Sequence, residues 1–294
     1  MEDPGAIVAP ILVTGASGAI GGAVAARLCA DRRPVVLWTR DREGGETACR
    51  KLLGRFPRSR IELVDGDLGS LRAVGQGAER VASSCPRLGG VIHSAAVLTR
   101  RREETSEGLE RMFATNHLGP FLLTRELLAR LDPSLPFRVL TVAPPSATPL
   151  DLDDLLARRR FRSLPAFAAT KTANLMFAFA LARRFGRGPR TSNVFFPGVV
   201  RSGLMREAPI FVRGFVRAVG SSAERAGEAL AWLSTGAPLA SANGAFFEGT
   251  RVGSPPDYVM DAGLQERLWS ECERLVIEAV GRGPPPSRSA LAPR

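Results

Sequence analysis

The chain contains very few of the side chains that most often bind metal ions or act as acids and bases. Its 294 residues include two histidines, one tyrosine and four cysteines. No cysteine stands at metal-ligand spacing or in a CxxC pair, which favours free thiols in a reducing compartment, and we predict no metal site. These scarce residues are His93, His117, Tyr258, Cys29, Cys49, Cys85 and Cys272.

A long apolar run and a secretory leader are also missing. The longest apolar candidate, Ala173 to Ala182, is shorter than the roughly 18 residues that a membrane span needs, and Arg183 and Arg184 follow it. The first residues, Met-Glu-Asp-Pro, lack the basic segment that begins a signal peptide. We expect a soluble, cytoplasmic protein without a membrane partner.

Lysine is almost absent, because all but two of the 40 basic residues are arginine. The formal net charge is +11, and short arginine runs occur at 100–102 and 158–160. Aromatic residues do not interleave with these runs and no nucleic-acid-binding motif occurs, so we predict no nucleic-acid partner. We interpret the charge mainly as arginine bias. The alternative is an electric field that attracts an anionic cofactor and an acidic substrate.

Residues 11–21 contain the pattern around which the rest of the chain is organised. They read Ile-Leu-Val-Thr-Gly-Ala-Ser-Gly-Ala-Ile-Gly, which is an apolar strand, a glycine-rich turn and the start of an alanine-rich helix. Gly15 suits a sharp turn, Gly18 lets the backbone approach a phosphate, and Gly21 lets the helix pack closely on the sheet. The free N–H groups at the start of the helix would face a pyrophosphate. The pattern predicts a dinucleotide site.

Strand-like apolar runs alternate with helical segments, which is typical of a parallel sheet covered by helices. We predict one α/β domain over residues 1–280, with a Rossmann-like doubly wound sheet. A substrate lid at about 203–220 and a disordered tail over 281–294 complete the expected organisation. The predicted strands are 11–13, 35–38, 61–64, 90–93, 139–142, 193–196 and 245–248. The predicted helices are 19–32, 43–53, 71–82, 107–131 with an interruption at Gly119-Pro120, 168–184, 223–233 and 264–280.

Four motifs fall in the order found in the short-chain dehydrogenase/reductase family, which the chain resembles from about residue 8 to about residue 250. Two of them, 14–21 and 91–96, are similar to the extended and atypical branches. The other two, 116–119 and 197–202, are similar to the standard branch near its retinol-dehydrogenase-like members. The resemblance implies hydride transfer between a nicotinamide cofactor and a carbonyl or alcohol.

The resemblance also implies which residues hold the cofactor. Arg40 follows the second strand, where an arginine fits the 2′-phosphate of NADP, so NADP is preferred over NAD. Asp41 is a competing carboxylate, which leaves NAD open. Asp67 and Leu68 stand where the family holds adenine. The full set of expected cofactor-binding residues is Gly15, Ser17, Gly18, Ala19, Ile20, Gly21, Arg40, Asp67, Leu68, Ser94, Ala95, Ala96, Lys171, Pro197, Gly198, Val200 and Ser202.

The catalytic positions match the family only in part. Lys171 occupies the lysine position and Asn116 the asparagine position. The tyrosine position is Phe167, and the serine position falls near Pro144. A phenyl ring cannot donate a proton. Retention of a lysine in an arginine-rich chain favours a role for Lys171 on the nicotinamide ribose, because a lysine is a compact donor.

Three sources could supply the missing proton. A nearby hydroxyl, Ser94 or Ser146, is one, although an unperturbed serine is a poor acid. Tyr258 is the second, if it folds over the pocket. The third is a substrate phenol beside the ketone, whose pKa of about 10 is similar to that of tyrosine. This third source predicts an NADPH-dependent ketoreductase for a polycyclic aromatic polyketide in antibiotic biosynthesis. The chain resembles the tyrosine-less angucyclinone ketoreductases of the simocyclinone type in this respect.

Two other functions stay open on the sequence. One is a catalytically inactive, NADP-binding partner subunit, and the other is a non-redox isomerase or cyclase on the same scaffold. The chain could also assemble with copies of itself. The apolar stretch 209–219 suits a lid over a flat hydrophobic ligand, or a helix packed on the core.

Overall fold

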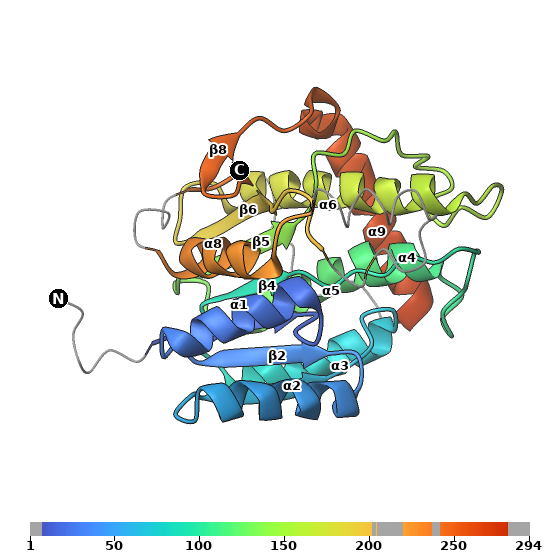
Figure 1. Ribbon diagram of the computed structural model, residues 1–294. Helices are drawn as coiled ribbons and strands as arrows, with labels where there is room; N and C mark the ends of the chain where they lie inside the picture. The colour runs from blue at the N-terminus through green and yellow to red at the C-terminus, as the bar shows by residue number, and fades with distance from the viewer. Residues whose placement is uncertain (1–7, 202–203, 205–219, 237–241, 282–294) are drawn as a thin grey trace.

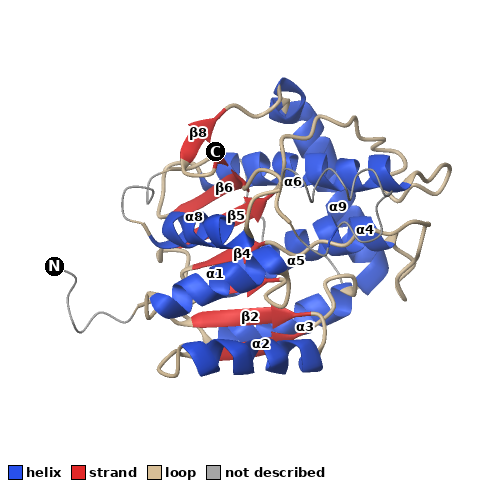
Figure 2. Cartoon of the chain, viewed as in Figure 1, coloured by secondary structure: helices blue, strands red, loops and turns tan. Residues whose placement is uncertain are grey.

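The computed structural model describes residues 8–201, 204, 220–236 and 242–281. Its strands form one sheet in the order β3-β2-β1-β4-β5-β6-β7-β8, in which only the β7–β8 pair is antiparallel. The predicted Rossmann-like α/β fold is therefore confirmed (Figures 1 and 2). The strands are β1 (Ile11–Thr14), β2 (Val35–Thr39), β3 (Ile61–Asp65), β4 (Gly90–His93), β5 (Phe137–Val142), β6 (Arg190–Phe196), β7 (Phe246–Glu248) and β8 (Arg251–Gly253).

Helices cover both faces of the sheet (Figure 2). One face packs mainly against α1, α2 and α8, and the other mainly against α3, α5, α6 and α9. The helices are α1 (Ala19–Ala30), α2 (Arg42–Arg55), α3 (Leu71–Ser84), α4 (Arg111–Phe113), the π-helical turn η1 (Ala114–Leu118), α5 (Gly119–Arg130), α6 (Ser163–Phe185), α8 (Ala223–Thr235), the 3₁₀ turn η4 (Asp257–Met260) and α9 (Ala262–Val280).

Successive residues of the central strands enter different halves of the core. Leu12 and Val36 pack in the cluster beneath α3, α5 and α6, whereas Val13 and Leu37 pack beneath α1 and α8. All four are at most 1% exposed. A parallel strand covered by helices on both faces has no solvent side, so it reads as a continuous apolar run. This explains why β1 and β2 were recognisable in the sequence.

Several boundaries differ from the predicted ones. The interruption predicted around Gly119-Pro120 corresponds to the π-helical turn η1, which ends at Leu118. Helix α5 continues from it at Gly119, with Pro120 in its first turn. The helix predicted from residue 107 begins at Arg111 after the capping carboxylate of Glu110. Helix α6 begins at Ser163, five residues before the predicted start. The antiparallel strand β8 was not predicted.

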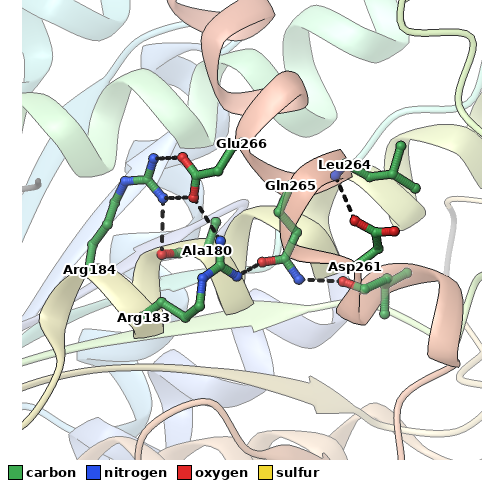
Figure 3. A network of polar contacts seen from close by, with 8 residues as sticks. Ala180, Arg183, Arg184, Asp261, Leu264, Gln265 and Glu266 are labelled. Atoms are coloured by element: carbon green, nitrogen blue, oxygen red, sulfur yellow. Dashed lines mark hydrogen bonds and ion pairs between the residues drawn. The ribbon is translucent and has the colours of Figure 1, made fainter. Parts of the chain in front are cut away.

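Helix α9 is fastened to the end of α6 by the network in Figure 3. The guanidinium of Arg184 forms two hydrogen bonds with the carboxylate of Glu266, at 2.9 and 2.5 Å, and lies 3.8 Å from the ring centroid of Trp269. Arg183 bonds Glu266 and Gln265, and Gln265 donates to the carbonyl of Val259. This network fixes α9 over the aromatic core of α5 and α6.

Helix α6 has the length and apolar composition of a membrane span. The longest apolar candidate in the sequence, Ala173 to Ala182, is too short to indicate such a helix. Its most apolar 18-residue window is 72% buried within the protein, as in the core helix of a globular fold. The helix also carries the buried Lys171. Apart from Leu204 and Gly220, the predicted lid at 203–220 lies outside the described residues, and so does the predicted tail beyond Gly281.

Candidate functional site

The glycine-rich turn after β1 is built as the sequence predicts. Gly15 has a φ of +67°, and a Cβ there would lie 2.8 Å from the Cα of Ala95. A Cβ on Gly21 would lie 2.4 Å from the carbonyl oxygen of Gly15. Gly15 therefore has to be glycine because of its backbone conformation and because no space is left for a Cβ. Gly21 has to be glycine because of the missing space alone. The turn brings the start of α1 against the loop that follows β4.

The first turn of α1 leaves its N–H groups available. Gly18 is the N-cap residue and provides no side-chain cap, unlike the Asp41, Ser70 and Asp261 caps of α2, α3 and α9. Residues 17–19 are exposed. An exposed, uncapped helix start with glycine at its cap is a site for a phosphate. These residues fit the pyrophosphate of a dinucleotide.

Thr14 and Ser94 join the turn to the loop after β4. The hydroxyl oxygen of Thr14 accepts hydrogen bonds from the N–H groups of Ser94 and Ala95, at 3.1 and 3.3 Å. The Ser94 hydroxyl donates to the Thr14 carbonyl at 2.5 Å. These contacts hold the small residues Ala95 and Ala96 next to Gly15. Thr14 is a site residue that the sequence reasoning missed, although its place directly before Gly15 was visible.

Except for Lys171, which lies on α6, the predicted cofactor-binding residues follow the carboxyl ends of β1, β2, β3, β4 and β6. These strands are parallel, with β5 between β4 and β6, so their carboxyl ends lie along one edge of the sheet, which is where α/β folds bind ligands. Pro197 and Gly198 follow β6, and Gly198 has a φ of +75°. Val200 forms a parallel bridge with Ser221. Ser202 lies outside the described residues.

Arg40 and Asp41 have different environments at the end of β2. The side chain of Arg40 is 71% exposed, and its Nε lies 3.5 Å from Oδ2 of Asp41. The other carboxylate oxygen of Asp41 accepts from the N–H of Gly44 and caps α2. Asp41, the competing carboxylate, is thus engaged by its own helix. Arg40 remains accessible to an anionic group.

Asp67 and Leu68 lie beyond β3. Oδ1 of Asp67 accepts from the N–H of Gly69 at 2.8 Å, and its Oδ2 lies 3.8 Å from the guanidinium of Arg111. Leu68 is 4% exposed, and its carbonyl lies so close to Gly119 that a Cβ there would be 2.3 Å away. The strand end, the loop and the start of α5 are therefore packed in one fixed arrangement.

Lys171 and Phe167 lie one helical turn apart on α6. Lys171 is 6% exposed and Phe167 is 8% exposed. The ammonium nitrogen lies 5.1 Å from the centroid of the phenyl ring, at a distance typical of a cation–π contact. Burial lowers the pKa of Lys171 to about 8. The phenyl ring thus faces the ammonium group of Lys171, with no proton to offer.

Asn116 lies in η1 and connects the loop after β4 to α6. Its Oδ1 accepts from the N–H of Val97 at 2.7 Å, and its Nδ2 donates to the Val97 carbonyl and to the hydroxyl of Thr170. The Thr170 hydroxyl in turn donates to the carbonyl of Phe167 at 2.7 Å. Every polar atom of the Asn116 amide thus has a partner within the chain. Its catalytic role stays a prediction, and its visible role is to position this loop.

The hydroxyls considered as proton donors make other contacts. Ser146, beyond Pro144, bonds the carbonyl of Ala168 and the hydroxyl of Thr172 on α6. The Ser94 hydroxyl donates to Thr14, as above. The Tyr258 hydroxyl accepts from the N–H of Leu150. Its ring packs in the large core cluster, whereas Phe167 belongs to a separate one with Leu98 and Met112. None of these contacts directs a hydroxyl toward Lys171.

The two histidines lie inside the core. His93 bonds the hydroxyl of Thr124, and burial lowers its pKa to about 3. His117 lies between Asn174 and Cys272, and burial lowers its pKa to about 4. Both rings are therefore neutral at pH 7. Within the described part of the chain, no group of three or more potential ligands could hold a metal ion.

The fold and the glycine-rich turn at the sheet edge define a Rossmann-type dinucleotide-binding protein. Residues 9–210 match the short chain dehydrogenase family, and the chain belongs to this family. Human retinol dehydrogenase 13 is 30% identical over 277 residues, which are 90% of this chain and 84% of that one. Mouse polyprenol dehydrogenase is 32% identical over 278 residues, 90% of this chain and 82% of that one.

Solved structures agree with this assignment. An uncharacterised protein from Mycobacterium paratuberculosis has a TM-score of 0.68 and 26% identity, over 91% of this chain and 93% of that one. A short chain dehydrogenase from Burkholderia cenocepacia, in complex with NADP, has a TM-score of 0.64 and 20% identity, over 82% and 96% of the two chains. The second likeness shows the fold alone.

Proposed function

We propose that the protein is an NADPH-dependent ketoreductase whose substrate is a polycyclic aromatic ketone with a phenol beside the reacting carbonyl. A polyketide of an antibiotic pathway has this chemistry. The proposal rests on one observation: the residues that suit the cofactor are all present, while the position beside Lys171 is filled by the phenyl ring of Phe167.

The chain would perform the binding and orienting parts of this reaction. A bound nicotinamide supplies the hydride. The start of α1 would hold the pyrophosphate, and Arg40 would contact the 2′-phosphate of NADP. Lys171 would donate hydrogen bonds to ribose hydroxyls, for which its ammonium is suited whether or not a tyrosine is near. Ala95 and Ala96 have side chains small enough to allow a close approach.

The proton is the part that the chain does not supply in this proposal. Addition of hydride to a ketone leaves an alkoxide that must gain a proton. A general acid accelerates such a step by roughly 10²–10⁴-fold. A phenol that is already hydrogen-bonded to the ketone oxygen can donate that proton within the substrate. The partly buried residues Phe161 and Leu164, which pack against the cluster of Phe167, Leu98 and Met112, offer an apolar surface for the aromatic rings.

A second candidate comes from the relatives. Retinol dehydrogenase 13 and polyprenol dehydrogenase each resemble this chain over 90% of its length, and their names indicate long apolar alcohols. The same apolar surface would suit such a chain. Phe167 argues against this candidate, because an isolated alcohol or aldehyde brings no acid or base of its own.

The decisive experiment compares two ketones that differ by one methyl group. We would follow NADPH oxidation with a peri-hydroxy polycyclic ketone and with its O-methyl ether, using the wild type and Phe167→Tyr. The wild type should reduce the hydroxy ketone about 10²-fold or more faster than the ether. Phe167→Tyr should reduce this preference, because the variant has its own acid. Equal rates in the wild type would exclude substrate assistance.

The same assay separates the other functions. Faster oxidation of retinol with NADP than reduction of any hydroxy ketone would favour the second candidate. NADPH binding without turnover of any carbonyl would favour an inactive partner subunit. Product formation without net consumption of NADPH would favour an isomerase or cyclase.

A further inference from the structure

Two arginine-rich loops meet beside Phe167. The first, residues 98–104, follows β4, and the second, residues 151–162, leads into α6. The Nε of Arg102 donates to the carbonyl of Leu156 at 3.2 Å, and the hydroxyl of Ser163 donates to the carbonyl of Thr99 at 2.5 Å. Both loops lie on the side of the molecule where α4 and the start of α6 are found (Figure 1).

The carboxylates of this region are each engaged by an arginine. In the first loop, Glu104 pairs with Arg102 at 2.6 Å and Glu103 pairs with Arg111 at 3.0 Å. In the second loop, Arg159 contacts both Asp151 and Asp154, at 2.7 and 3.5 Å. The remaining acid, Asp153, lies 4.0 Å from Arg267. The acidic side chains of both loops are therefore already used.

Four guanidinium groups are left over. They are exposed, and no ion pair joins them to a carboxylate in the described part of the chain. We call this group the arginine rim; it consists of Arg101, Arg158, Arg160 and Arg162. Positive charges without paired carboxylates, on two loops that are in contact, favour the binding of an anion. A guanidinium fork also matches the geometry of a carboxylate or phosphate.

The rim borders the apolar surface of the site. Phe161 stands between two of the rim arginines in the sequence and packs, together with Leu164, against the cluster of Leu98 and Phe167. An apolar surface with cations at its edge suits a ligand with an apolar body and a charged end. Arg40 is a separate feature, because it follows β2 while the rim follows β4 and precedes α6.

We propose that the substrate carries an anionic group, a carboxylate or a phosphate, which the arginine rim binds while the apolar body lies against Phe161 and Phe167. The inference rests on the proposed function, since it defines the ketone more narrowly. It also assigns a binding role to part of the positive charge of the chain, which a general bias towards arginine does not.

The test measures binding, so that it does not depend on turnover. The probes are anthraquinone-2-carboxylate and the neutral 2-(hydroxymethyl)anthraquinone, titrated by calorimetry at low and at physiological salt into the protein loaded with NADP⁺, which cannot reduce them. The test variant is Arg101→Glu/Arg160→Glu. The control variant, Arg58→Glu/Arg87→Glu, changes the net charge equally. Its two exposed arginines precede β3 and β4, at the opposite ends of the strands.

The wild type should bind the carboxylate probe about tenfold more tightly than the neutral probe at low salt, because charge-assisted hydrogen bonds are the strong ones. Added salt should weaken this preference. The test variant should lose the preference and the control should keep it. If turnover of hydroxy ketones fails while this pattern holds, the reductase proposal falls and the anion site stands.

Three results would overturn the inference. The first is an equal affinity of the wild type for both probes. The second is an equal loss of preference in the two variants, which would mean that only the overall charge matters. The third is tight binding to phosphatidylglycerol vesicles that is lost in the test variant, together with equal affinity for the two probes. This result would mean that the arginine rim binds a membrane surface.

Discussion

Replacing Lys171 with methionine should make the protein more stable at neutral pH. Lys171 is 6% exposed, and burial lowers its pKa from 10.5 to about 8. At pH 7 the ammonium is charged in both the folded and the unfolded chain, so the full cost of burying the charge applies. A shift of this size corresponds to about 3 kcal/mol, of which the contact with Phe167 offsets about 1 kcal/mol. The Lys171→Met substitution should therefore raise the free energy of unfolding by about 2 kcal/mol.

The sign of the pH dependence follows from the lowered pKa. Between pH 8 and 10.5 the unfolded chain binds more protons at this residue than the folded chain does. The stability of the wild type therefore rises relative to that of Lys171→Met as the pH increases through this window. At pH 10 the advantage of the variant should fall below about 1 kcal/mol.

Urea unfolding of the apoprotein at pH 7 and pH 10 measures both differences. The control is Lys51→Met, because Lys51 is the only other lysine and is exposed on α2. This variant should show no such change between the two pH values. A Lys171→Met variant that is no more stable than the wild type at pH 7, or whose advantage does not shrink at pH 10, would refute the reasoning. We also expect this variant to bind NADPH more weakly, which would show that the buried charge is kept for its ligand.

Three further changes test the site and its supports. Arg40→Ser should raise the Kd for NADPH about tenfold and leave that for NADH unchanged, measured by fluorescence titration, because only NADPH has the 2′-phosphate; equal effects on both would count against this role. Gly21→Ala should cost about 1–3 kcal/mol of stability and weaken cofactor binding, since its Cβ would meet the Gly15 carbonyl at 2.4 Å, and wild-type stability would contradict this close packing. Glu266→Ala should cost about 2 kcal/mol in urea unfolding, because Arg184 loses both of its hydrogen bonds to the carboxylate, and an unchanged midpoint would mean that water replaces them.

The sequence predicted the parts of the fold that depend on local patterns. The strands β1 and β2 are apolar up to their final threonine because both faces of the sheet are covered. The turn at Gly15 needs glycine for reasons visible in its spacing. Other features depend on partners far away in the chain. Strand β8 forms only by pairing with β7. The early start of α6 and the π-helical turn η1 accompany the contacts of Ser163 with Thr99 and of Asn116 with Val97.

The candidate site, too, has features that local sequence patterns predict and features that depend on contacts with distant residues. Residue types at known spacing predicted that Lys171, Phe167 and Arg40 belong to one cofactor site, and the structure places Arg40 at the end of β2 and the other two on α6. The sequence did not reveal that Asp41 is used as a helix cap, nor that Asn116 bonds the backbone of Val97. It also did not distinguish paired from unpaired arginines, because pairing depends on which loops meet in space.

The two buried tryptophans give the molecule a natural optical readout. Trp38 lies in β2 and donates a hydrogen bond to the Gly66 carbonyl, close to the proposed adenine site. Trp269 lies on α9 beneath the guanidinium of Arg184. Their emission reports on different parts of the fold. With the exposed Trp232 replaced by phenylalanine, replacing either buried tryptophan as well leaves a single emitter. Such a pair of variants would reveal whether α9 detaches in the same cooperative event in which the nucleotide-binding half melts.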